Sequence, residues 1–306
     1  MSDEENIRKG VLSGVLSAVF FSAMAVFVKL ADQRLSSGDI LFIRAFYGMV
    51  ILSLFCRSHL LRVFKFSACW LWARAFFGAA SVYFYYWNIR HSSLAVATLL
   101  TDLSPIFVMG ISCVFLKSKL QWVALVGVAV SCLGVMYLGR VDIKDVSIQV
   151  LIFGFLSAAC SAAAYVSLKQ AAERFPISLI LFCFSTGMAT VGLLNSSSGV
   201  HLGLWAIKVP IVLLIVFSYL AQYYMTLSYK YLPATAASTL GLTACLWAYI
   251  IDLALGEAFD YKKAGILLIV LFGVKMTLPI NSAQENIDSC RIDIKSRFNF
   301  LRKIFD

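Results

Sequence analysis

Ten apolar segments of about twenty residues divide this sequence and leave only short polar joints between them. A helix rises about 1.5 Å per residue, so about 20 apolar residues cross the roughly 30 Å hydrocarbon core of a bilayer. The joints have no room for a soluble domain. The segments are approximately 10–30, 39–56, 69–89, 93–116, 120–139, 148–171, 177–194, 207–228, 233–255 and 263–280. We predict an all-α integral membrane protein with ten transmembrane helices.

The composition agrees with this class. The chain is 61% hydrophobic and only 14% charged, with a mean hydropathy of +0.86. Its net charge of +10 could indicate a nucleic-acid partner. The Lys and Arg residues fall mainly at segment ends and in the C-terminal tail, however, where such residues orient a membrane protein. We therefore predict contact with membrane lipid and no nucleic-acid partner.

Residue types typical of catalytic and metal sites are scattered. The eight cysteines contain no C-x-x-C pair and lie mostly inside apolar segments, where they pack as small hydrophobic residues. The histidines, His59, His91 and His201, lie in predicted loops, and neither H-E-x-x-H nor G-x-S-x-G occurs. We predict no enzyme activity, no metal and no cofactor.

An internal repeat organises the ten segments. Residues 14–34 align with 154–174 without gaps at an offset of 140, which places Gly14 on Gly154 and Lys29 on Lys169. A nearly constant register over half the chain favours duplication over chance similarity between apolar helices. We predict two EamA-like five-helix units, at 10–139 and 148–280, between an N-terminal tail at 1–9 and a basic tail at 281–306.

An odd number of spans in each unit makes the two units enter the membrane in opposite senses, which is an inverted repeat. With both termini in the cytoplasm, fifteen of the 26 Lys and Arg residues lie inside, eight lie outside and three lie within spans. This bias predicts cytoplasmic termini. The basic tail mixes cations with apolar residues, which suits either a helix on the membrane surface or a disordered segment.

An aspartate interrupts the fourth apolar segment at mid-membrane depth, in LLTDLSPIFVMG at 99–110. A carboxylate there costs about 2.5–3.5 kcal/mol on insertion scales, so it needs a partner, water or a ligand. Thr101 lies beside Asp102, and Pro105 cannot donate a backbone hydrogen bond, so a kink is expected. Asp102 is either a substrate contact or proton-coupling group, or a partner in a structural ion pair or hydrogen bond.

Two arginines lie about five residues inside predicted span ends. Arg44 and Arg74 either extend to the membrane surface or face a shared cavity. In the second case Arg44 could pair with Asp102 or bind a substrate carboxylate through two hydrogen bonds. Lys275 in the last span is expected to extend to the surface.

Aromatic and small residues supply further candidates. Tyr85 and Tyr224 lie in aromatic stretches that could stack on a planar ligand or a cation, or could form an interfacial aromatic belt. Ser17 and Ser157 lie in small-residue stretches that favour close helix packing and could also line a cavity.

Two stretches, at 17–48 and 95–116, resemble EamA-type members of the drug/metabolite transporter superfamily. They read SAVFFSAMAVFVKLADQRLSSGDILFIRAFYG and AVATLLTDLSPIFVMGISCVFL, and the resemblance extends over about 10–280. It implies a helical basket whose cavity is lined by the first, third, fourth, sixth, eighth and ninth spans, with the fifth and tenth at the periphery. The branch most similar to this chain contains S-adenosylmethionine uptake carriers of intracellular bacteria. Many members carry Gly-Glu after both the fourth and ninth spans, whereas this chain keeps Gly256-Glu257 but has Lys117-Ser118.

These features predict a secondary transporter of the bacterial inner membrane that works by alternating access. No nucleotide-binding G-x-x-x-x-G-K-[ST] motif occurs, so coupling would come from an ion gradient or substrate exchange. The expected small-molecule substrate is S-adenosylmethionine or a related amino-acid-like compound. Carriage of another amino acid, a nucleobase or riboflavin, a non-transporting scaffold role, and a homodimer remain open.

Overall fold

The computed structural model is helical throughout the residues that it describes. These are 3–31, 37–56, 68–92, 94–115, 122–138, 147–196, 209–254, 256 and 259–278. The first unit contains α1 (Asp3–Ala31), α2 (Ser37–Cys56), α3 (Cys69–His91), α4 (Leu94–Thr101), α5 (Ser104–Phe115) and α6 (Trp122–Leu138). The second contains α7 (Ile148–Arg174), α8 (Ile177–Leu194), α10 (Val209–Tyr231), α11 (Ala234–Gly241), α12 (Ala244–Ala254) and α13 (Tyr261–Thr277). The tail at 281–306 lies outside the described residues.

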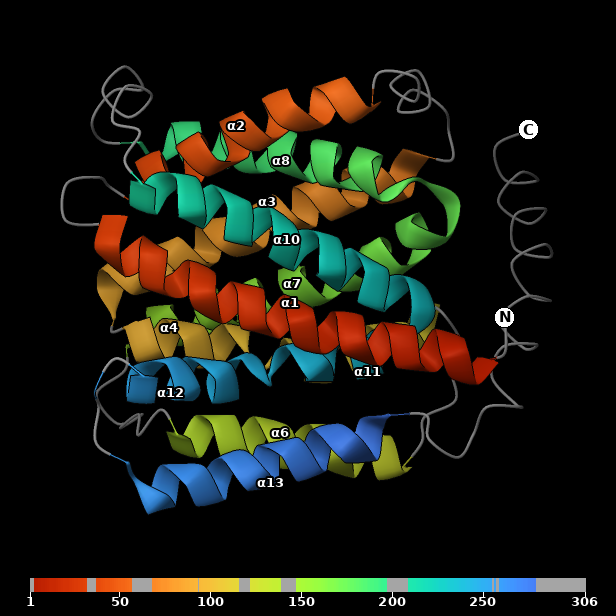
Figure 1. Ribbon diagram of the computed structural model, residues 1–306, viewed down its shortest axis with the longest axis vertical. Helices are drawn as coiled ribbons and strands as arrows, with labels where there is room; N and C mark the ends of the chain where they lie inside the picture. The colour runs from red at the N-terminus through yellow and green to blue at the C-terminus, as the bar shows by residue number, and fades with distance from the viewer. Residues whose placement is uncertain are drawn as a thin grey trace.

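The helices form a bundle of stacked pairs (Figure 1). α2 packs against α8 at one end of the bundle, and α6 packs against α13 at the other. Between them lie α1 against α10 and α3 against α7, together with the short helices α4, α5, α11 and α12. The peripheral position of α6 and α13 agrees with the expected arrangement of the fifth and tenth spans.

The outside of the bundle is apolar and the inside holds many polar groups. Leu54, Val114 and Phe272 are 75%, 70% and 61% exposed, whereas Asn88 and Thr226 are fully buried. Such a distribution suits a hydrocarbon solvent, where lipid covers the outer side chains and polar groups find partners inside.

Six described helices are long and apolar enough to cross a membrane, counting α4 with α5 and α11 with α12 as one span each. They cover 4–27, 96–115, 148–174, 177–194, 209–231 and 234–254, and 122–137 is a shorter apolar helix. The chain is thus a multi-pass membrane protein. The total of ten spans and the inverted arrangement of the two units stay predictions.

The helix boundaries repeat along the chain. α3 begins at Cys69 and α10 at Val209, while α4 begins at Leu94 and α11 at Ala234, an offset of 140 in both cases. We call two residues separated by this offset mirror residues. The packing repeats as well, because α1 contacts α10, α11 and α12, while α7 contacts α3, α4 and α5.

Both units contain one broken span. In the first, the break falls between Thr101 and Ser104, just before Pro105, as the missing amide of proline predicts. In the second, the break falls between Gly241 and Ala244 without any proline. There the backbone tightens into an i to i+3 turn, and the Thr243 hydroxyl donates to the Leu240 carbonyl at 2.7 Å.

The closest contacts between the units occur in mirror positions. A Cβ atom on Gly14 would lie 2.7 Å from Leu240 Cδ1, and one on Gly154 would lie 2.3 Å from Leu100 Cδ1. Gly14 and Gly154 are mirror residues, and so are Leu100 and Leu240. Gly14 in α1 and Gly154 in α7 therefore each pack against the corresponding leucine of the other unit, as two-fold packing requires.

Glycine at these positions lets the helices approach closely, so an added methyl group is expected to destabilise the protein. We predict that Gly154→Ala lowers the free energy of unfolding by about 1–3 kcal/mol through overpacking. Gly110→Ala is the control, because a Cβ there meets nothing within 4 Å, and it should stabilise α5 by about 0.5–1 kcal/mol. Thermal unfolding in detergent measures both. Equal shifts in the same direction would contradict the packing described.

Candidate functional site

A chain of hydroxyl groups joins α3, α4 and α7 near the first break. Thr101 Oγ1 lies 3.1 Å from Ser157 Oγ, which lies 3.4 Å from Ser81 Oγ. Ser81 Oγ in turn lies 2.5 Å from Ser161 Oγ. Two predicted site residues, Thr101 and Ser157, are thus brought together at the point where the fourth span is interrupted.

The two predicted serines also tie the units to each other. Ser157 donates to the Ser81 carbonyl at 3.1 Å, and Ser17 donates to the Ala221 carbonyl at 3.0 Å. These bonds are mirror-related, since Ser17 matches Ser157 and Ser81 matches Ala221. Both serines are buried and serve the helix packing.

Asp102 follows Thr101 directly at the end of α4. Its amide donates to the Thr98 carbonyl at 2.8 Å, and its own carbonyl accepts a weak bond from Cys132 Sγ at 3.8 Å. Within the described part of the chain, its carboxylate forms no ion pair, so the pairing with Arg44 is not made. The Asp102 side chain is half-buried, and no cation among the described residues pairs with it.

Arg74 lies inside the bundle and does not extend to the membrane surface. Its side chain is 4% exposed, and Nη2 donates to Gln222 Oε1 at 3.3 Å. The guanidinium carbon lies 4.2 Å from the centre of the Phe184 ring and 5.7 Å from that of Tyr165. Among the residues that the structure describes, no carboxylate pairs with this cation. Ring contacts and one amide therefore hold a buried charge.

Arg44 lines a small pocket next to Arg74. The pocket is formed by Arg44, Ala45, Leu181, Phe184, Ser185, Met188, Ser218, Tyr219 and Gln222. Arg44 Nη1 lies 3.4 Å from Met24 Sδ. Phe184 and Gln222, which line this pocket, also contact Arg74. The pocket has room for about one water molecule, so a metabolite needs it to widen.

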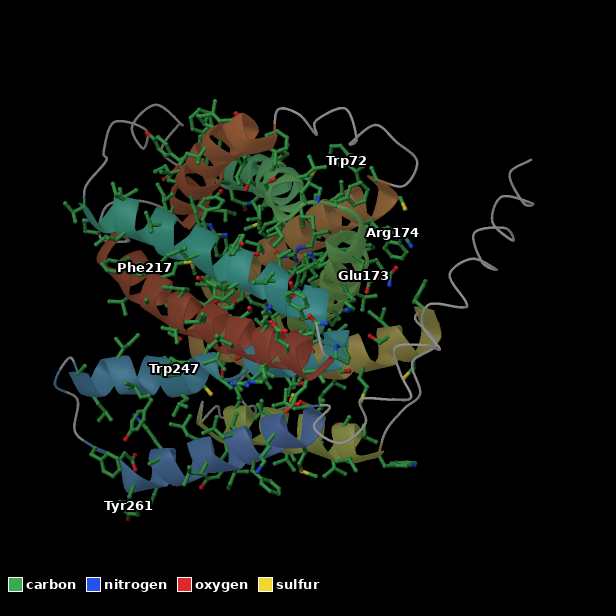
Figure 2. All side chains as sticks on the ribbon, turned by 45° about the vertical axis from the view of Figure 1, so that its right-hand side comes forward. Trp72, Glu173, Arg174, Phe217, Trp247 and Tyr261 are labelled. Atoms are coloured by element: carbon green, nitrogen blue, oxygen red, sulfur yellow. The ribbon has the colours of Figure 1, made fainter. Side chains whose placement is uncertain are left out.

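The two predicted stacking residues lie in different surroundings. Tyr85 Oη lies 3.2 Å from Thr98 Oγ1, while the Tyr224 ring stacks on Phe20 with centres 5.6 Å apart. Phe217, labelled in Figure 2, continues this α1–α10 stack by packing on Phe20 at 6.0 Å. No ring contact among the described residues joins Tyr85 to Tyr224. A shared aromatic cage is therefore not formed in this conformation.

Sequence reasoning missed three residues around Arg74. Gln222 carries a signal in the sequence, because it is a polar residue within an apolar span, directly before Tyr223 and Tyr224. Phe184 and Tyr165 carry no signal of their own, because aromatic residues are common in apolar helices. Lys275 is exposed on α13, as expected of a cation that extends to the surface. Across the described residues, no three His, Cys, Asp or Glu side chains gather in a way that could hold a metal ion.

Comparison with known proteins agrees with this membrane fold. Residues 8–140 match the EamA-like transporter family. This part of the chain is therefore similar to a unit of that family. A Helicobacter pylori J99 protein named as a transporter is 27% identical over 89% of this chain and 97% of its own length. The pseudopaline exporter CntI of Pseudomonas aeruginosa is 30% identical over 58% of this chain and 63% of its own.

A solved crystal structure shares the fold of this EamA-like chain. It superposes with a TM-score of 0.68 at 17% identity, over 88% of this chain and 96% of that one. The family match and the relatives named as transporters indicate a membrane transporter and not an enzyme. The EamA-like match at 8–140 has nearly the bounds of the first predicted unit.

The buried guanidinium of Arg74 is expected to cost folding stability. Replacing buried ionic groups with well-packed apolar side chains of similar volume is often neutral or stabilises a protein by about 1–4 kcal/mol. Because Arg74→Met also loses the ring contacts, we predict a gain near the lower end, about 1 kcal/mol. Arg44→Met, at a half-buried position, should change stability less. Thermal unfolding in detergent checks this, and a loss of stability in Arg74→Met would reveal an acidic partner.

Proposed function

We propose that this EamA-like chain is a secondary carrier of a small organic metabolite across the bacterial inner membrane. Its two five-helix units would lie inverted in the bilayer, with both termini in the cytoplasm, and would alternate access to a central site. The mirror-related contacts of α1 with α10 and of α7 with α3 support this arrangement.

The observation that carries the proposal is the buried position of Arg74, with which no acid pairs in the part of the chain that the structure describes. A cation inside a membrane protein marks a substrate or ion pathway when no protein group neutralises it. Arg44 lines a small pocket together with Phe184 and Gln222, the two side chains that contact Arg74. A substrate carboxylate would supply the missing charge and accept two parallel hydrogen bonds from one guanidinium.

Asp102 adds the opposite charge to this centre. Asp102 directly follows Thr101, whose hydroxyl contacts Ser157, and its carboxylate can pair with an ammonium or a sulfonium group. The proposed substrate is therefore an amphoteric amino-acid-like compound, with S-adenosylmethionine as the first candidate. The relative named as a pseudopaline exporter supports carriage of a metabolite but leaves the direction open. Another amino acid, a nucleobase or riboflavin is the alternative cargo.

Uptake into proteoliposomes tests the assignment. We predict that Arg74→Gln lowers the initial rate of S-adenosylmethionine uptake roughly 10- to 100-fold, since a hydrogen bond to a charged group contributes about 1.5–3 kcal/mol. Lys275→Gln, which removes an exposed cation of α13, should transport at the wild-type rate. Wild-type rates in Arg74→Gln at equal protein levels would refute the assigned site.

Asp102→Asn separates two roles of the acid. If Asp102 binds the substrate cation, the variant should lose both uphill uptake and exchange of labelled for unlabelled substrate. If Asp102 couples transport to protons, uphill uptake should stop while exchange continues. Unchanged uptake and exchange would remove Asp102 from the mechanism.

A further inference from the structure

The bundle has two faces that the helix directions define. The N-face is the face at which α1 begins, and the far face is the opposite one. α10 runs antiparallel to α1, because Gly10 lies beside Leu232 and Phe27 stacks on Phe217. α7 likewise runs antiparallel to α3, and Lys169 near its end reaches the Lys230 carbonyl of α10 at 3.2 Å. The ends of α7 and α10 therefore meet at the N-face.

Packing between helices closes the N-face. α7 contacts α10, and α11 contacts both α5 and α7. Each of these helix pairs has a mirror pair, in which each helix is replaced by the corresponding helix of the other unit. The mirror pairs are α1 with α3, α4 with α12, and α4 with α1, and they lie at the far face. Among the described residues, none of these three pairs makes a comparable contact. The two faces therefore differ although the units are alike.

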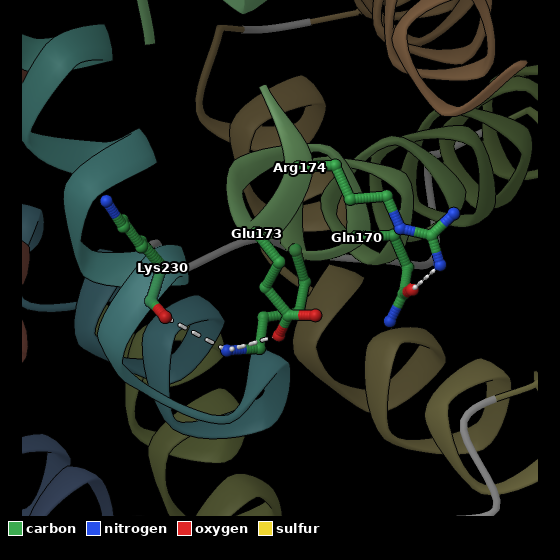
Figure 3. A network of polar contacts seen from close by, with 5 residues as sticks. Gln170, Glu173, Arg174 and Lys230 are labelled. Atoms are coloured by element: carbon green, nitrogen blue, oxygen red, sulfur yellow. Dashed lines mark hydrogen bonds and ion pairs between the residues drawn. The ribbon is translucent and has the colours of Figure 1, made fainter. Parts of the chain in front are cut away.

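Side chains at the N-face form a layered seal. The rings of Tyr165 and Tyr229 pack 5.5 Å apart, and Tyr229 is 2% exposed. Closer to the surface, Lys169 Nζ pairs with Glu173 at 3.2 Å while it also donates to the Lys230 carbonyl (Figure 3). Buried Leu168 and Leu232 continue the same apolar cluster.

The mirror positions of the ring pair carry no aromatic side chain. Tyr165 and Tyr229 correspond to Ala25 and Ile89. Side-chain exposure also differs between the two faces. Thr98 on α4 is exposed, whereas its mirror residue Ser238 on α11 is buried. The far face thus lacks the helix contacts and the ring pair that close the N-face.

We propose that Tyr165 and Tyr229, tied by Lys169, form a gate that keeps the empty carrier closed at the N-face and open at the far face. With cytoplasmic termini, the resting carrier would receive substrate from outside the cell. Arg74 lies over the Tyr165 ring, so the gate touches the site that the substrate would occupy. This inference rests on the proposed carrier function.

Thiol labelling from each side tests the gate without any substrate. In a background with the eight native cysteines replaced, Thr98→Cys and Ser238→Cys place one thiol at mirror positions. We expect a membrane-impermeant maleimide to react with Thr98→Cys, applied from the far face, on the order of tenfold faster than with Ser238→Cys, applied from the N-face. Equal rates would overturn the proposal.

Gate variants should change this ratio. Adding Tyr165→Leu removes the ring pair and should speed labelling of Ser238→Cys roughly two- to tenfold. Tyr165→Phe keeps the ring and should restore the slow rate, and Tyr223→Leu removes an exposed ring of α10 and should change nothing. If Tyr165→Leu does not insert, Lys169→Gln is used with the same expectation. An unchanged rate in the gate variants would refute the gate.

The labelling result and the uptake result can fail separately. Unequal labelling without uptake of any tested metabolite would overturn the carrier function while the gate geometry held. Uptake that depends on Arg74 together with equal labelling would overturn the gate alone.

Discussion

Close packing of α1 against α10 and of α3 against α7 is the contact on which the rest of the structure depends. Lipid is as apolar as leucine, so membrane helices associate through tight packing and hydrogen bonds instead of hydrophobic burial. Gly14 and Gly154 each admit a leucine of the other unit, and Ser17 and Ser157 donate to backbone carbonyls across the same interfaces. These contacts fix where the broken spans lie and hold the polar residues at the centre of the bundle.

At that centre, charged side chains lie without an oppositely charged partner among the described residues. Arg74 is held by Gln222 and two rings, and Asp102 lies near a hydroxyl chain with no cation among the described residues. Charged groups held in this way contribute little to stability, and they can bind a ligand of opposite charge. A pocket that admits about one water molecule implies movement of the surrounding helices during transport, and the unequal packing of the two faces indicates how they move.

Much of the helical framework could be predicted from the sequence, because hydrophobic length sets it. The prediction of 69–89 corresponds to Cys69–His91, 148–171 to Ile148–Arg174, and the proline marked the first break. The break before Ala244 could not be predicted, since tertiary packing and not a proline produces it. The site was only partly visible: Arg74 and Asp102 stood out as charges in apolar spans, whereas Phe184 and Tyr165 gain their roles only through contacts between distant helices. The same reason explains why Arg44 does not meet Asp102 and why Tyr224 stacks on Phe20 instead of facing Tyr85.

The most direct measurement of the inverted arrangement locates the starts of α1 and α7 in an intact membrane. Glu4, at the N-terminal end of the first candidate span, and Ile148, at the start of α7, are both exposed, so single cysteines there can be labelled with an impermeant thiol reagent. Two units threaded in opposite senses predict that Glu4→Cys reacts only from the cytoplasm and Ile148→Cys only from the other side. Reaction of both positions from the same side would contradict the two-unit architecture and the carrier built on it.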